Sequence, residues 1–155
     1  MHARLHNTMM RVAGQTLGLL LRRGIRLGPM MLLTVRGRLT GRLRTNPVDL
    51  FEDDGRQWLV STHGVGDSNW VRNLRAAGEG TLARGSRRYS FTAVELSQRE
   101  AGFVLRDVVG PRLARPVAGF VLRRTLRVRG DASADDFVRT AEQHPVFELA
   151  LTDAN

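Results

Sequence analysis

The chain has 155 residues, of which 42% are hydrophobic, and this length and composition are typical of one globular domain. It contains no cysteine, which excludes disulfides, thiolate catalysis and the common structural zinc sites. Its formal net charge of +9 favours an anionic partner, whether nucleic acid, an acidic membrane surface or a small polyanion. We predict no metal site and expect the four histidines to be surface or packing residues.

The N-terminal segment has apolar residues at helical spacing from Leu5 to Leu21, with arginines on the other side. This pattern predicts an amphipathic helix that packs on the domain, and contact with a membrane surface is the alternative. The apolar run is too short and too interrupted for a signal peptide or a spanning helix, so we expect a cytoplasmic protein, with membrane association as the alternative. Residues 1–28 would form this helix and a linker, and residues 29–155 a single barrel domain.

A turn rich in glycine and arginine follows the buried strand predicted at Met30–Val35. It contains Gly37 and Gly41. Four arginines stand in it or beside it: Arg36, Arg38, Arg42 and Arg44. Glycine lets the backbone approach a ligand closely, and a guanidinium group matches the oxygens of phosphate and carboxylate. All 24 basic residues are arginine, as coding bias would produce, so only such a cluster predicts an anion site.

The rest of the chain alternates short strand patterns with helices. Strands are predicted over Thr45–Glu52, Gln57–Thr62, Thr81–Ala83, Arg87–Leu96 and Val146–Leu151. Helices are predicted over Asp67–Ala77 and after the capping residues Ser97 and Ser133. Pro111–Arg129 is basic and apolar at once and predicts no particular element. Strands in meander order with late helices predict a mainly β protein with helices (α+β), built on a small antiparallel barrel.

Three segments carry a resemblance to a known family. They are LLTVRGRLTGRLRTNP from Leu32, STHG from Ser61 and NWVRNLRA from Asn69. Together they resemble the deazaflavin-dependent nitroreductase family. The resemblance implies a split β-barrel of the FMN-binding type and the binding of coenzyme F420, in preference to FMN. It also implies hydride transfer from the reduced coenzyme to an organic acceptor.

The resemblance further implies a binding site for the coenzyme. Its turn would bind the acidic tail, the loop after the third strand would lie beside the phosphate, and a tryptophan and an asparagine would border it. The positions implied are Arg36, Gly37, Arg38, Thr40, Gly41, Arg42, Arg44, Asn46, Pro47, Ser61, Thr62, His63, Gly64, Trp70 and Asn73. No catalytic side chain is implied, because the coenzyme performs the hydride chemistry.

The chain departs from the family pattern in ways that leave two functions open. Leu39 stands where a basic residue is usual, and His63 stands where lysine is common. The better-known reductases of the family carry tyrosines near the C-terminus that face the acceptor, whereas the only tyrosine of this chain, Tyr89, lies earlier and on a predicted strand. One function is an F420-dependent reductase of a quinone, enone or nitro compound, lipophilic acceptors included. The other is a relative that binds a fatty-acyl ligand or a cofactor without catalysis. Nucleic acid is disfavoured because the arginines lack paired exposed aromatics, and the sequence is compatible with a homodimer.

Overall fold

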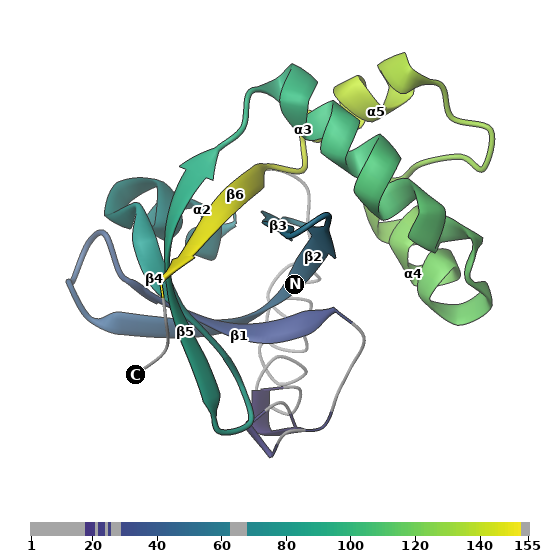
Figure 1. Cartoon of the computed structure of the whole chain (residues 1–155). Helices are drawn as coiled ribbons and strands as arrows, with labels where there is room; N and C mark the ends of the chain where they lie inside the picture. The colour runs from purple at the N-terminus through teal and green to yellow at the C-terminus, as the bar shows by residue number, and fades with distance from the viewer. Residues whose placement is uncertain (1–17, 21, 24, 26–28, 63–67, 153–155) are drawn as a thin grey trace, which may run out of the picture.

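The structure is a computed structural model that describes residues 18–20, 22–23, 25, 29–62 and 68–152 (Figure 1). Most of the predicted N-terminal helix lies outside these residues, and Gly18–Leu20 and Arg22 are helical. Among the described residues, none of the helices has the length and apolar character needed to cross a bilayer.

Six antiparallel strands close into a barrel in the order β1-β2-β3-β6-β5-β4. They are β1 (Met30–Arg36), β2 (Leu43–Asp53), β3 (Arg56–Val60), β4 (Glu79–Arg84), β5 (Arg87–Glu95) and β6 (Val146–Thr152). The last strand closes the barrel by pairing with β3 on one side and β5 on the other. This arrangement confirms the predicted α+β fold built on an antiparallel barrel.

Pro47 occupies a part of β2 that has a strand partner on one side. It pairs with Leu32 of β1, whereas β3 pairs with β2 only over Asp49–Asp53. Because proline has no N–H to donate, it is tolerated where one side of a strand is unpaired. The one-sided pairing of this part of β2 therefore accommodates Pro47.

Helix α2 (Asn69–Ala77) packs its apolar side into the barrel interior. Val71 and Leu74 are buried and belong to the same core as Leu33 and Phe91 of the strands. The helix ends at Gly78, whose φ of 68° is left-handed and suits glycine. The packing of Val71 and Leu74 thus fixes α2 against β1.

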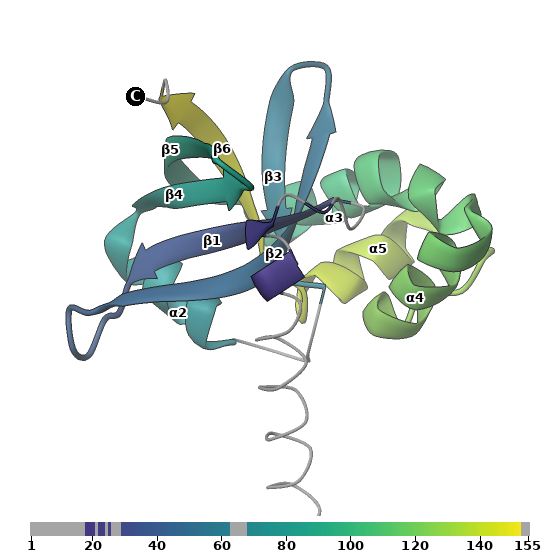
Figure 2. The same cartoon turned by 90° about the horizontal axis from the view of Figure 1, so that it is seen from below.

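A separate group of helices packs against the outside of β2 and β3 (Figures 1 and 2). It comprises α3 (Gln98–Val104), the π-helical turn η1 (Leu105–Val109), the 3-10 turn η2 (Gly110–Ala114), α4 (Pro116–Leu126) and α5 (Ala134–Ala141). The segment Pro111–Arg129 thus forms η2 and α4, which sequence patterning did not assign. A Cβ at Gly102 would lie 2.7 Å from the Val138 Cα, so glycine permits the close contact of α3 with α5.

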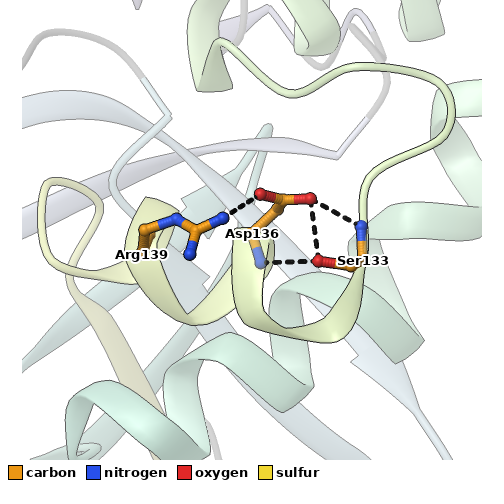
Figure 3. A network of polar contacts seen from close by, with 3 residues as sticks. All are labelled: Ser133, Asp136 and Arg139. Carbon is orange, nitrogen blue, oxygen red and sulfur yellow. Dashed lines mark hydrogen bonds and ion pairs between the residues drawn. The ribbon is translucent and has the colours of Figure 1, made fainter.

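The helices α3 and α5 begin with the predicted capping residues. Ser97 forms a capping box with Glu100, and Ser133 forms one with Asp136. In the second box the Ser133 backbone N–H donates to Asp136 Oδ2 at 2.8 Å, and Arg139 forms an ion pair with the other carboxylate oxygen (Figure 3). These contacts satisfy backbone donors at the first turn of each helix.

Candidate functional site

The connection between β1 and β2 is a tight turn that depends on its two glycines. The Gly37 N–H donates to Arg42 O at 2.8 Å, and the Gly41 N–H donates to Gly37 O at 2.8 Å. Gly41 has a left-handed φ of 67°, and a Cβ at Gly37 would lie 3.0 Å from Arg42 O. A side chain at either position would therefore strain the turn.

The four arginines of this turn divide into two that brace it and two that do not. Arg36 Nη1 donates to Gly41 O at 3.1 Å. Arg38 donates to Asn73 Oδ1 through its backbone N at 3.2 Å and through Nη1 at 3.0 Å. The side chains of Arg42 and Arg44 are exposed and have no hydrogen-bond or ion-pair partner among the described residues. Arg42 and Arg44 are therefore free to bind an external anion.

Helix α2 connects the turn to the start of β6. Asn73, which contacts Arg38, is buried. One helical turn earlier, the half-buried Trp70 packs against Phe147 of β6, with ring centroids 6.1 Å apart. Trp70 therefore packs against the barrel core.

Ser61 and Thr62, which follow β3, are buried at the same end of the barrel as the Gly37 turn. Thr62 Oγ1 donates to Asp49 Oδ2 of β2, and the Ser61 N–H donates to Pro145 O at 3.0 Å. Ser61 Oγ is buried and has no partner among the described residues. The same holds for Ser68 Oγ at the N-cap of α2. His63 and Gly64 lie outside the described residues.

His144 holds the Ser61 backbone in place. Its Nδ1 lies 2.7 Å from Ser61 O, and because a carbonyl oxygen only accepts, Nδ1 carries the proton. Burial lowers the pKa of His144, the bond to Ser61 raises it, and the nearby Arg127 lowers it, with a net decrease. The imidazole is therefore neutral at pH 7, as a buried packing residue should be.

The remaining predicted residues lie along the same hairpin. Thr40 Oγ1 accepts a hydrogen bond from the Arg42 backbone N at 3.4 Å. Asn46 and Pro47 lie in β2, opposite Leu33 and Leu32 of β1. The structure thus brings the turn and Asn73 into direct contact, and it connects Ser61 and Thr62 to this end through β2 and β6.

Two residues of this region were not among those predicted. Asp49 is 5% exposed and contacts Thr62, and His144 contacts Ser61. A carboxylate between Val48 and Leu50 in a strand was the available signal for Asp49. No sequence signal links His144 to Ser61, because the contact joins residues 83 positions apart.

The candidate site is a surface at one end of the barrel. Two cavities lined by described residues both lie away from the turn. This end of the barrel carries several donors: two guanidinium groups without partners among the described residues, the buried hydroxyls of Ser61 and Ser68, and the N-terminus of α2. Donors of this kind suit an extended anion that carries phosphate or carboxylate groups. Among the described residues, no three His, Asp or Glu side chains gather as metal ligands would.

Several solved structures are similar to this chain. A structure described as an F420-H2 dependent reductase (FDR-A) shares 19% identity with the chain, covering 79% of this chain and 94% of its own, with a TM-score of 0.45. One described as a domain-swapped dimer shares 17% identity, over 96% of this chain and 98% of its own, with a TM-score of 0.49. A Clostridium acetobutylicum protein related to general stress protein 26 shares 12% identity, over 79% and 74% of the two chains, with a TM-score of 0.49.

Comparison of the sequence with family models identifies the family. No curated protein matches it. The model of one family, described as F420H(2)-dependent quinone reductase, matches residues 2–110, well over half of the chain. The chain therefore belongs to the F420H(2)-dependent quinone reductase family, whose cofactor is coenzyme F420.

Proposed function

We propose that this chain is a reductase that binds coenzyme F420 at the Gly37 turn and reduces a quinone, or an enone or nitro compound of similar size. The observation that supports this most is the pair of free arginines, Arg42 and Arg44, beside a turn that Arg36 and Arg38 brace. A braced turn fixes the backbone that carries these two arginines, so binding has to order only their side chains.

Each part of the site has a proposed role toward the coenzyme. Arg42 and Arg44 bind the acidic tail, because guanidinium groups bind carboxylates with two parallel hydrogen bonds. Ser61 and Ser68 donate their unpartnered hydroxyls to the phosphodiester, near the N-terminus of α2. Trp70 borders the coenzyme with the part of its ring that Phe147 leaves uncovered. His63 and Gly64 remain predictions for the phosphate.

The chemistry itself asks little of the side chains. Reduced deazaflavin supplies the hydride when it is bound, and the protein binds, orients and excludes water. The family description supports a quinone as acceptor. The N-terminal helix and linker over residues 1–28, the barrel domain over 29–155, a homodimer and peripheral membrane contact stay predictions of the sequence.

Titration and turnover test the proposal together. Oxidised F420 fluorescence should be quenched saturably by the protein, with FMN binding at least about tenfold more weakly because it lacks the long acidic tail. Reduced F420 should then be oxidised when a soluble naphthoquinone is added. Absence of saturable quenching would show that the protein does not bind the coenzyme and would contradict the proposal.

The alternative function gives a different result in the same assay. A relative that binds F420 without catalysis would quench fluorescence yet leave reduced F420 intact with quinone, enone and nitro acceptors alike. A relative that holds a fatty-acyl ligand would retain a lipid that mass spectrometry of the purified protein can detect. Either result would replace the reductase assignment.

A further inference from the structure

A cavity lies at the barrel end opposite the Gly37 turn. It has a volume of about 890 Å³, within the size range of small-molecule sites. Met31 in its wall precedes Gly37 by six residues on β1, a separation of roughly 20 Å at the rise of a strand. Of the residues predicted to bind the coenzyme, none that the structure describes lines this cavity.

The cavity combines an apolar floor with a basic rim. The apolar part consists of Met31, Leu50, Leu82, Tyr89, Leu122 and Leu151. The basic part consists of Arg22, Arg23, Arg84, Arg87, Arg112 and Arg115. Glu52 is the one acidic residue among the described residues that line it. The lining therefore carries a large excess of positive charge.

Two buried polar atoms of this cavity lack partners. Arg84 Nη2 donates to Met30 O at 3.0 Å, but Arg84 Nε is buried with no acceptor among the described residues. Gln57 Oε1 is likewise buried and unpartnered, although Gln57 Nε2 donates to Glu52 at 3.4 Å. A buried guanidinium N–H without an acceptor is costly, and a ligand oxygen would satisfy it.

The rim arginines differ in how firmly they are held. Arg112 donates to the backbone carbonyls of Val108 and Glu52, the second at 3.2 Å, and its guanidinium lies 5.2 Å from the ring centroid of Phe51. The side chains of Arg87 and Arg115 have no hydrogen-bond or ion-pair partner among the described residues. The same cavity is therefore lined by an arginine that backbone carbonyls hold, Arg112, and by two whose side chains have no described partner, Arg87 and Arg115.

Clustered guanidinium groups repel one another, and one carboxylate cannot balance several of them. A ligand with one negative charge would neutralise one arginine, whereas a ligand with several would satisfy the cluster while covering the apolar floor. We propose that this arginine-rimmed cavity is a second binding site, separate from the coenzyme site, for a small organic polyanion with an apolar or aromatic body and two or more phosphate or carboxylate groups.

Calorimetric titration of the full chain with four probes tests the ligand class. At about 150 mM salt, where distant charges are screened, ATP should bind. Adenosine lacks the charge and should not bind, and tripolyphosphate lacks the apolar body and should bind several-fold more weakly. Decanoate has one charge and should bind at least about tenfold more weakly than ATP. Decanoate as the best ligand, or equal binding of tripolyphosphate and ATP, would overturn the proposed class.

Variants then test the location. Arg87→Gln and Arg115→Gln should each weaken ATP binding by about five- to tenfold. Arg88→Gln, one residue along β5 and outside the cavity lining, is the matched control and should bind ATP like the parent. Arg44→Ala, which removes a cation at the turn end, should leave ATP affinity unchanged. Weaker ATP binding by Arg44→Ala, or equal effects of Arg87→Gln and Arg88→Gln, would overturn a separate site at this cavity.

Discussion

The two ends of the barrel are both rich in arginine, yet they use it differently. At the Gly37 turn the arginines lie on an exposed hairpin, where two of them brace the backbone and two are free. At the opposite end the arginines surround an apolar floor, and one buried guanidinium N–H has no described acceptor. Clustering alone therefore does not specify a ligand. The partners of each guanidinium and the surface beneath it distinguish an extended acidic tail from a compact polyanion.

The largest combined effect on stability and coenzyme binding is expected from Asn73→Leu at the turn end. It removes the acceptor of two Arg38 hydrogen bonds, which should lower the free energy of unfolding by about 1–3 kcal/mol. Because the turn loses its contact with α2, the Kd for F420 should rise about tenfold. Arg72→Leu, on the exposed side of the same helix, is the control. Lower stability with an unchanged Kd would show that the brace does not serve the site.

Gly41→Ala and Gly85→Ala form a matched pair at the two ends. Both glycines have left-handed φ values, 67° and 61°, so each substitution should cost about 1–2 kcal/mol in urea unfolding. Only Gly41→Ala should weaken F420 binding, by several-fold, because Gly85 lies at the cavity end. Equal effects of the two substitutions on F420 would contradict the assignment of the ends.

The smallest effect concerns pH and His144 at the turn end. Burial holds the pKa of folded His144 below its ordinary value of about 6.5. As pH falls below about 6.5, the unfolded chain takes up a proton that folded His144 does not, so the free energy of unfolding should decrease. Above that pH the contribution is fully present. Urea unfolding between pH 7 and 5 should show this slope, and His144→Gln should reduce it; an unchanged slope would assign it to other groups.

Local requirements were the most predictable part of the molecule. Short-range geometry and periodicity predicted all six strands, the turn glycines Gly37 and Gly41, and the capping residues Ser97 and Ser133. Pro111–Arg129 was not assigned, because its arginines alternate with apolar residues and α4 is stabilised by packing.

Features formed by distant segments could not be read from the sequence. The cavity arginines come from the N-terminal segment, the end of β4, the start of β5, η2 and the residue that follows η2, so only the fold places them together. The split of the turn arginines depends on Asn73, which is 35 positions away from Arg38. The contact of His144 with Ser61 likewise requires β6 to pair with β3.

The affinity of Arg44→Ala for oxidised F420 tests the central claim most directly. Arg44 is exposed, and its guanidinium group has no hydrogen-bond or ion-pair partner among the described residues. The stem of its side chain lies beside Gly37, so the substitution should disturb the turn little. Fluorescence titration should give a Kd at least about tenfold higher than that of the parent, since a charge-assisted contact is lost, while Arg87→Gln should bind F420 like the parent. An unchanged Kd for Arg44→Ala, or an equal loss in Arg87→Gln, would contradict the proposal that the coenzyme binds at the turn end.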